Sequence, residues 1–328
     1  MKILIAGLGS IGRRHLRNLK ALGETDILLY RTNHATLPDE ELASFPVETD
    51  LSRALAQKPD AVIVSNPTAL HLDVAIPAAE AGCHLLLEKP ISNSLDRVDA
   101  LAAAAQKSGS RILVGFQFRF HPALRKAREL ILAGCIGRVL SARAHWGEYL
   151  PNWHPWEDYK QGYAARPDLG GGVILTLSHP LDYLRWLCGD VESLWAFTST
   201  SGLGLSVEDA AEIGLRFCTQ AIGSVHLDYN QRPPSHHLEV IGSKGALRWD
   251  NADGILHCYH IETNIWETVA PPEGFERNVL FLEEMRHFLS IARGENEPIC
   301  TLEDGKRALQ IALAAMDSGQ SGQSIRFD

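Results

Sequence analysis

A glycine pattern near the start of the chain, Gly7-Leu8-Gly9-Ser10-Ile11-Gly12, restricts the possible folds more than any other feature. It follows a short apolar run at 3–6, typical of a buried strand, and it opens a helical stretch over 11–22. In this context a G-x-G-x-x-G turn binds a dinucleotide. Gly7 would make the tight turn, Gly9 would let the pyrophosphate approach, and Gly12 would let the helix pack on the strand. Ser10 and Ile11 would present backbone N–H groups to the phosphates at the helix N-terminus. The alternative interpretation is a structural turn without a ligand.

The rest of the first 120 residues continues an alternation of strands and helices. Compact apolar runs of strand length occur at 27–30, 61–65, 85–87 and 112–115, and helical patterns lie between them at 51–57, 69–81 and 95–107. Strands that are apolar on both faces indicate a parallel sheet covered by helices on both sides. With right-handed crossovers, this pattern predicts a doubly wound α/β domain, the Rossmann fold, at 1–120.

After residue 120 the pattern changes to longer strands with alternating polar and apolar residues. A helix over 122–133 precedes strands at 138–146, 212–217, 223–229, 237–241 and 246–249, and two late helices cover 276–292 and 303–318. Runs of strands after an alternating βα segment favour a separate domain. We therefore expect a second, α+β domain at 121–328 with a large, mainly antiparallel sheet.

Composition excludes several other classes of protein. The 328 residues suffice for two domains at about 150 residues each. A net charge of −9 gives no overall basic field that would attract nucleic acid or an anionic membrane. The six cysteines include no Cys-x-x-Cys pair, and the N-terminus leads directly into a strand pattern, from which we expect no signal peptide. We expect a cytoplasmic protein that binds neither nucleic acid nor membrane.

The end of the second strand indicates which dinucleotide is bound. NAD-binding folds usually carry an acidic residue there, bonded to the ribose hydroxyls. This chain has Arg31 followed by Thr32. An arginine can pair with the 2′-phosphate of NADP, and Arg13 could assist it. We therefore favour NADP(H) as the cofactor, with NAD(H) possible; the alternative is that Arg31 is solvated and stacks on the adenine.

Three further motifs complete a family pattern. The segments Ser65–His71 and Leu87–Pro90 both follow predicted strands, and Gly170-Gly171-Gly172 precedes His179 and Asp182. Together with the glycine fingerprint, these motifs resemble the glucose–fructose oxidoreductase, inositol dehydrogenase and rhizopine-catabolism (Gfo/Idh/MocA) family over essentially the whole chain. The resemblance implies a nicotinamide-dependent oxidoreductase whose second domain also carries the oligomerisation surface, so we expect a homodimer or homotetramer.

The resemblance also assigns roles in the first domain. Lys89 would be a catalytic lysine between the nicotinamide and the substrate hydroxyl, where an ammonium stabilises developing alkoxide charge. Pro90 would shape the turn, with a cis peptide as one option. Asn66 and Pro67 look like residues that line the nicotinamide ribose. Glu88, Lys89 itself and His71 are further candidates for cofactor binding, although His71 could equally be a structural histidine bonded to the backbone.

His179 is the candidate general base, because an imidazole suits proton removal from an alcohol. Many relatives carry an aspartate one turn before this histidine, where this chain has Leu175 and Thr176. Asp182 lies one turn later on the same helix face and could orient the imidazole, contact substrate or pair structurally.

The remaining site candidates follow the sixth strand or precede the triple glycine. The predicted substrate-binding residues are Gln117, Arg119, Trp146, Tyr163, Arg166 and Asp182. Arg119 could alternatively form an interdomain salt bridge, and aromatic residues such as Trp146 are often core residues. The histidines show no spacing of a known zinc site, so we expect no metal.

The sequence thus predicts hydride transfer between a nicotinamide and a secondary alcohol or ketone carbon of a sugar, cyclic polyol or sugar derivative. Lys89 would polarise the oxygen and His179 would exchange its proton. Two alternatives stay open. One is a reductase of a non-sugar C=N or C=C ligand; the other is a non-catalytic NADP-binding sensor or regulator.

Overall fold

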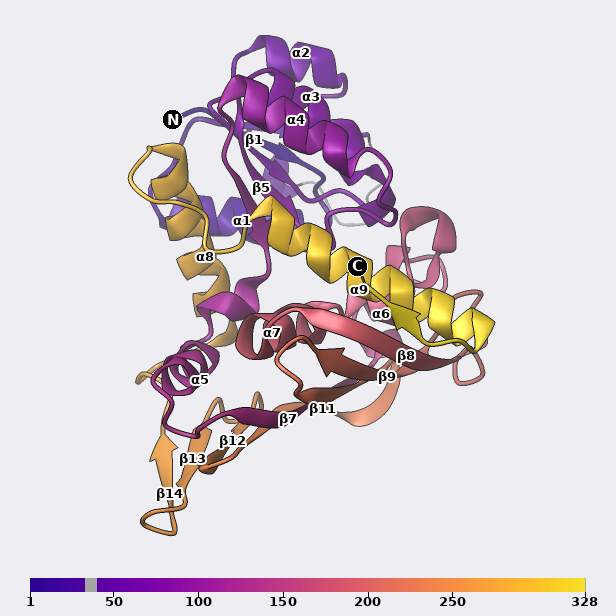
Figure 1. Cartoon of the computed structure of the whole chain (residues 1–328). Coiled ribbons are helices and arrows are strands. Elements are labelled where there is room, and N and C mark those ends of the chain that lie inside the picture. The colour runs from indigo at the N-terminus through magenta and orange to yellow at the C-terminus, as the bar shows by residue number, and fades with distance from the viewer. Residues whose placement is uncertain (33–39, 328) are drawn as a thin grey trace. The chain divides into compact units, whose positions relative to one another are not determined.

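A computed structural model describes residues 1–32 and 40–327 of the chain (Figure 1). It divides into two compact units. The first contains Met1–Gln117 and Arg277–Leu309, and the second contains Phe118–Glu276 and the chain from Gln310 onward. We expected a single boundary after residue 120, whereas residues 277–309 group with the first unit. The reason is long-range packing, since the helix that starts this segment packs against the first helix and the fifth strand.

The first unit is built on a six-stranded sheet in the order β3-β2-β1-β4-β5-β6. Its strands are β1 (Ile3–Ala6), β2 (Ile27–Tyr30), β3 (Val47–Glu48), β4 (Ala61–Val64), β5 (His84–Glu88) and β6 (Ile112–Gly115). All neighbouring strands run parallel. Strand β1 lies between β2 and β4, so the strand order reverses beside it, and ligands bind at such a switch point in open parallel sheets. The predicted Rossmann topology is confirmed.

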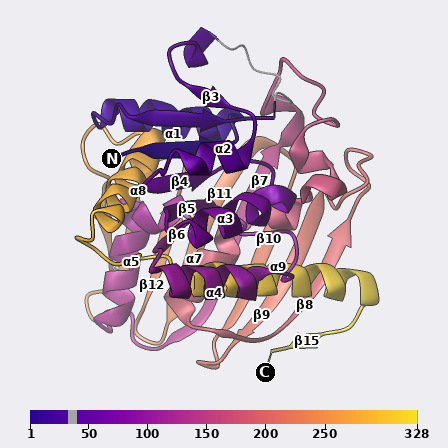
Figure 2. The same cartoon turned by 90° about the horizontal axis from the view of Figure 1, so that it is seen from above.

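Helices cover this sheet and bury its apolar strands. They are α1 (Ser10–Ala21), α2 (Leu51–Ala56), α3 (His71–Glu80), α4 (Val98–Ser108), α8 (Arg277–Ala292) and the first part of α9 (Leu302–Ser321). Helix α1 packs with α8, and α3 packs with α4 (Figure 2). Every residue of β1 and β4 is fully buried, as their continuous apolar sequences require.

The second unit contains a nine-stranded sheet in the order β14-β13-β12-β11-β7-β10-β9-β8-β15. The strands are β7 (Val139–Tyr149), β8 (Val191–Ser199), β9 (Ala210–Phe217), β10 (Ile222–Asp228), β11 (Asn230–Gly242), β12 (Gly245–Asp250), β13 (Leu256–His260), β14 (Ile265–Val269) and β15 (Ile325–Arg326). Strands β7 and β10 pair in parallel, and the other recorded pairs are antiparallel. The expected α+β fold with a mainly antiparallel sheet is confirmed.

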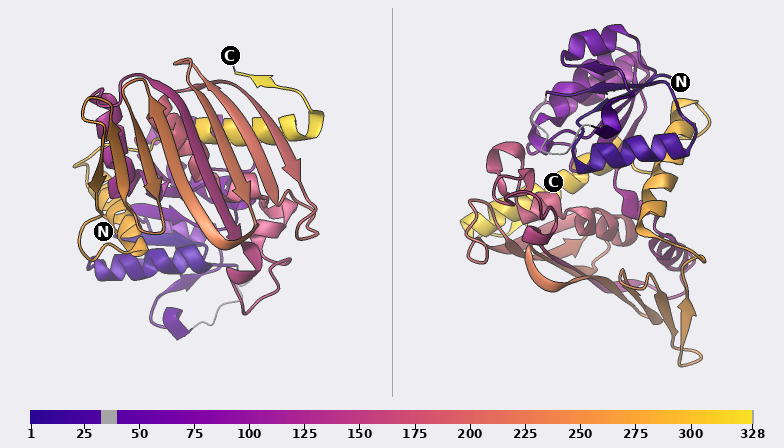
Figure 3. Two further views of the ribbon diagram at one scale, coloured as in Figure 1. Left: turned by 90° about the horizontal axis from the view of Figure 1, so that it is seen from below. Right: turned by 180° about the vertical axis from the view of Figure 1, so that it is seen from behind.

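Helices of the second unit lie on one face of this sheet. They are α5 (Pro122–Leu132), α6 (Val173–Thr176), α7 (His179–Cys188) and the end of α9, whereas the opposite face carries none of the helices described in this unit (Figure 3). Alternate residues of the strands, such as Val225 and Leu238, point to the covered face and are buried. Among the described residues, no helix is long and apolar enough to cross a membrane.

Candidate active site

The glycine turn between β1 and α1 has the shape of a phosphate cradle. Gly7 has a φ of +93°, and a Cβ on it would lie 2.3 Å from the backbone nitrogen of Asn66. A Cβ on Gly12 would lie 2.0 Å from the carbonyl oxygen of Gly7. A Cβ on Gly9, in contrast, would meet no atom within 4 Å. Gly7 and Gly12 are thus needed to close the turn, while Gly9 faces open space.

That space lies at the N-terminus of α1, which begins at Ser10 and continues with Ile11. Gly9 is the N-cap, no side chain caps the helix, and its first turn has no acidic residue. The first backbone N–H groups and the helix dipole therefore favour an anion at this point. These features fit the pyrophosphate of a dinucleotide, which needs close backbone approach and N–H donors.

The loop after β4 is fixed by hydrogen bonds to the glycine turn and to the loop after β5. The Ser65 hydroxyl donates to the carbonyl of Gly7 (2.9 Å). The two His71 ring nitrogens lie 2.9 Å from the carbonyl oxygens of Pro90 and Asn66. Burial lowers the pKa of His71, while the Glu88 charge and the two carbonyl contacts oppose this shift. His71 therefore ties the Asn66-Pro67 loop to the loop that carries Lys89.

The loop after β5 begins with Glu88, whose carboxylate is buried. Glu88 Oε1 lies 2.8 Å from Nε2 of His15, and Oε2 accepts the backbone N–H of Lys89 (3.2 Å). Burial raises the pKa of Glu88, but the hydrogen bond from His15 and the charge and backbone N–H of Lys89 outweigh it, so that pKa lies below its ordinary value. The Lys89–Pro90 peptide is cis, and the Lys89 side chain is half-buried.

Two arginines were candidates for a 2′-phosphate. Arg31 directly follows β2, its backbone N–H donates to Glu48, and its side chain is half-buried; Thr32 is exposed. Arg13 is 3% exposed, its Nε donates to the Leu8 carbonyl (3.0 Å), and it faces the Glu41 carboxylate. These contacts link Arg13 to the glycine turn and to Glu41, and its assistance in binding a 2′-phosphate stays a prediction.

In the second unit, His179 is the first residue of α7. Its ring is 1% exposed and packs edge-on against Phe118 (5.0 Å between centroids) and beside Trp146 (5.5 Å). The preceding glycines permit close chain contacts, because a Cβ on Gly171 would lie 2.5 Å from the carbonyl oxygen of Tyr163 and Gly172 has a φ of +112°. The segment before His179 thus needs glycine to adopt its course.

Two predicted substrate residues, Arg119 and Asp182, are bound to each other. Arg119 donates from Nε to Asp182 Oδ2 (2.9 Å) and from a terminal nitrogen to Oδ1 (2.6 Å). The two residues are 2% and 1% exposed. A bidentate pair of this kind locks the first turn of α7, which His179 begins, to the segment that follows β6.

The other predicted substrate residues lie in different surroundings. Trp146 is 5% exposed, donates to Glu148 (2.8 Å) and stacks on His236 (4.4 Å between centroids). Tyr163 is 38% exposed, Arg166 forms an ion pair with Asp168, and Gln117 is buried. The described structure alone assigns substrate contacts to none of them.

Sequence reasoning missed most of the aromatic cluster around His179. Phe118 contacts the rings of Tyr183, His236 and Trp249 as well as His179. These residues come from three separate elements, so no local spacing brings them together. His121 accepts the backbone N–H of Ala123 as the N-cap of α5, and burial lowers its pKa to about 4.

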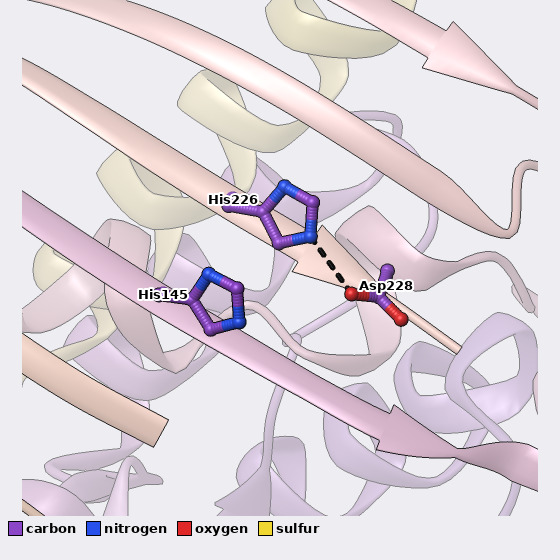
Figure 4. A group of neighbouring side chains, drawn as sticks. All are labelled: His145, His226 and Asp228. Carbon is purple, nitrogen blue, oxygen red and sulfur yellow. Dashed lines mark hydrogen bonds and ion pairs between the residues drawn. The ribbon is translucent and has the colours of Figure 1, made fainter. Parts of the chain in front are cut away.

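The helix-free face of the second sheet carries His145, His226 and Asp228, a group with the donor types of a metal site (Figure 4). The His145 and His226 rings are stacked, with centroids 4.5 Å apart and planes at 12°. Imidazole lone pairs lie in the ring plane, so in this stacked arrangement one metal ion cannot lie on the lone-pair axes of both rings. His226 instead contacts Asp228 (2.7 Å) and Glu212 (2.5 Å), which raise its pKa. The geometry is that of a salt-bridged imidazolium.

Comparison with known proteins identifies the family. Residues 1–116 match the model described as "Oxidoreductase family, NAD-binding Rossmann fold", and residues 124–248 match the "GFO/IDH/MocA C-terminal domain". These ranges cover more than half of the chain. The chain belongs to the GFO/IDH/MocA oxidoreductase family, as the sequence motifs predicted.

Individual relatives agree with this assignment. The chain is 28% identical to myo-inositol 2-dehydrogenase of Thermotoga maritima, over 100% of this chain and 99% of the relative. It is 29% identical to 1,5-anhydro-D-fructose reductase of Ensifer adhaerens, over 82% of this chain and 80% of that protein. A solved structure of levoglucosan dehydrogenase in complex with NADH has a TM-score of 0.89 at 21% identity, covering 100% of this chain and 99% of the other. At that identity the likeness shows a shared fold.

Proposed function

We propose that this protein transfers hydride between a nicotinamide dinucleotide and a secondary alcohol or ketone carbon of a sugar, cyclic polyol or sugar derivative. The observation that carries the proposal is the open space at Gly9, in front of the N-terminus of α1. This space suits a pyrophosphate, and the packing around Gly9 does not explain why a glycine stands there. Relatives named for myo-inositol and 1,5-anhydro-D-fructose support the class of substrate. When bound, the nicotinamide supplies the hydride acceptor or donor.

Lys89 and His179 divide the chemistry of the substrate oxygen in this proposal. The Lys89 ammonium binds the oxygen and stabilises the negative charge that develops on it. A ring nitrogen of His179 accepts the hydroxyl proton during oxidation and returns it during reduction. The Arg119–Asp182 pair acts on His179 indirectly, by holding the first turn of α7.

Further contacts in the proposal concern binding. Asn66 and Pro67 line the nicotinamide ribose, and His71 keeps their loop in place. Tyr163 and Arg166, which are exposed and half-buried, respectively, on the segment before the triple glycine, contact substrate hydroxyls together with Gln117. Trp146 covers an apolar face of the substrate beside His179.

We further propose that NADP(H) is preferred over NAD(H), and that the chain acts as a homodimer or homotetramer in the cytoplasm. Arg31 supports the cofactor preference, since it stands at the end of β2, where NAD-binding folds usually carry an acid. Thr32 adds a hydroxyl donor beside it. Some relatives are named for NAD, among them scyllo-inositol 2-dehydrogenase (NAD(+)) of Bacillus subtilis, so the preference needs its own measurement.

Steady-state turnover of a panel of inositols, anhydrosugars and hexoses, followed by nicotinamide absorbance, tests the reaction. We expect turnover by the wild-type protein and a loss of about 100-fold or more in Lys89→Ala, with the dinucleotide dissociation constant unchanged. Lys107→Ala, an exposed lysine at the end of α4, is the matched control and should behave as wild type. Full activity of Lys89→Ala would remove Lys89 from the mechanism. Tight dinucleotide binding without turnover of any substrate would instead favour a sensor.

A further inference from the structure

A buried cluster of three titratable side chains lies in the first unit, beside the backbone of Lys89. It consists of His15 from α1, Glu88 from the end of β5 and Glu284 from α8. They are 0%, 6% and 0% exposed, respectively. One nitrogen or oxygen atom from each residue lies within 4.8 Å of the others. The proposed chemistry assigns no role to His15 or Glu284.

The hydrogen bonds indicate the protonation states of His15 and Glu88. His15 Nε2 lies 2.8 Å from Glu88 Oε1, and the other Glu88 oxygen accepts the Lys89 backbone N–H. His15 Nδ1 has no hydrogen-bond partner among the described residues. A neutral imidazole with its proton on Nε2 satisfies this arrangement, because it donates to an ionised Glu88 and leaves only a lone pair at Nδ1.

The third residue, Glu284, is a buried carboxyl group that no hydrogen bond from a described residue stabilises in this arrangement. Neither of its carboxylate oxygens has a hydrogen-bond partner in the described parts of the chain, although the side chain is fully buried. Its neighbours on α8, including Phe281, Met285 and Phe288, are buried apolar residues. An ionised carboxylate without donors, close to a second carboxylate, would be strongly unfavourable there.

The charged groups around the cluster favour ionisation of Glu88. Arg14 from α1, Lys89 from the β5 loop and the His71 ring from α3 interact electrostatically with Glu88. Arg277, at the start of α8, acts on Arg14. For Glu284, burial and the Glu88 charge both raise the pKa well above its ordinary value. One negative charge and one neutral acid are therefore expected in the cluster.

We propose that Glu284 stays protonated at neutral pH and directs its O–H at the Glu88 carboxylate, so that Glu284 and His15 together hold Glu88. The contact is made after a small side-chain rotation or through one bridging water. Because Glu88 in turn holds the Lys89 backbone N–H, Glu284 and His15 are positioning residues for Lys89. The positioning role rests on the proposed function of Lys89, whereas the protonation of Glu284 does not.

A stability measurement tests the protonation without reference to activity. Unfolding exposes Glu284, which ionises above its ordinary pKa of 4.5, while the folded protein keeps the proton. The folded state then binds more protons, so the wild type loses stability from this residue as pH rises from about 5 to about 8. Glu284→Gln, a neutral isostere, lacks this loss, and its stability relative to wild type should increase over that range. Glu283→Gln, an exposed neighbour on α8, is the control and should show no such trend.

Infrared spectroscopy supplies the direct readout. The wild type should show a carboxylic-acid carbonyl band at neutral pH that is absent in Glu284→Gln and present in Glu283→Gln. Absence of the band, together with a flat stability difference, would show that Glu284 is ionised and overturn the proposal. A divalent metal found in the purified wild type and lost from Glu284→Gln would also overturn it, in favour of a metal site.

Kinetics test the positioning role. We expect Glu284→Ala to lower kcat roughly tenfold with little change in dinucleotide affinity, as for loss of a supporting hydrogen bond behind a catalytic group. Glu284→Gln should restore kcat, because the carboxamide keeps a donor. A Gln variant as impaired as the Ala variant would refute the positioning role. If Lys89→Ala were fully active, the proposed function would fail while the stability and infrared results still tested Glu284.

Discussion

Replacement of Asp182 by asparagine is expected to destabilise the second unit strongly. The substitution preserves shape but removes the negative charge opposite Arg119, which is 2% exposed and makes two hydrogen bonds to that carboxylate. Removal of one partner from a buried ion pair costs about 3–5 kcal/mol, because the remaining charge stays buried opposite a neutral group. For a unit of this size, about 2–4 °C of melting temperature corresponds to each kcal/mol, so we expect a decrease of roughly 6–20 °C.

Urea unfolding followed by tryptophan fluorescence measures this effect selectively. All seven tryptophans belong to the second unit, and one of them, Trp186, lies 5.7 Å from the Arg119 guanidinium. Asp168→Asn is the matched control, because it breaks the exposed Arg166–Asp168 pair and should cost no more than about 1 kcal/mol. The double variant Arg119→Met/Asp182→Leu should recover most of the loss. A loss for Asp182→Asn no larger than the control would refute the account of this pair.

Three other predictions follow from the structure. Gly9→Ala should fold with wild-type stability but bind dinucleotide weakly, because its Cβ meets only open space, whereas Gly12→Ala should be destabilised by its contact with the turn carbonyl; melting curves with and without nucleotide separate the two. The Asp228 hydrogen bond raises the pKa of His226, so the stability that this ion pair contributes is complete below pH 6.5 and is lost as pH rises through the raised pKa. Melting curves of His226→Gln should not show this loss. Arg31→Ser should weaken NADPH binding about tenfold or more while leaving NADH affinity nearly unchanged, and isothermal titration of both measures the ratio. Equal losses for the two nucleotides would remove Arg31 from 2′-phosphate binding.

Much of the first unit was predictable because its signals are local. Strands β1, β2 and β6 occupy the predicted ranges, since each is a continuous apolar run between turn residues. The glycine turn was predictable for the same reason, because its three glycines and the flanking strand and helix are adjacent in sequence. Strand β3 was missed, as it has only two residues.

Long-range packing explains where the structure differs from the sequence-based predictions. Helix α8 was predicted from its pattern, but nothing in that pattern shows that it packs with α1 in the first unit. Glu284 on the same helix interrupts an apolar face, and only the fold reveals that it meets His15 and Glu88. Strands β8, β13 and β14 were not predicted; β14 is mostly exposed and lacks the apolar alternation that identifies a strand.

In the candidate site, too, local motifs were predictable and contacts between distant segments were not. Lys89 and His179 could be chosen from motifs, and the structure describes their surroundings without testing their roles. The pairing of Arg119 with Asp182 could not be chosen, because the two residues are 63 positions apart and each also suited a polar substrate. The aromatic rings around His179 come from several elements and share no sequence signal.

A thermal-shift titration tests the central claim most directly. Nucleotide-free wild-type protein and Gly9→Ala are each titrated with NAD, NADH, NADP and NADPH. We expect concentration-dependent stabilisation of the wild type, larger with NADP and NADPH, and little or none in Gly9→Ala. Absence of a shift with all four nucleotides, in wild-type protein that melts cooperatively, would contradict dinucleotide binding and the oxidoreductase function built on it.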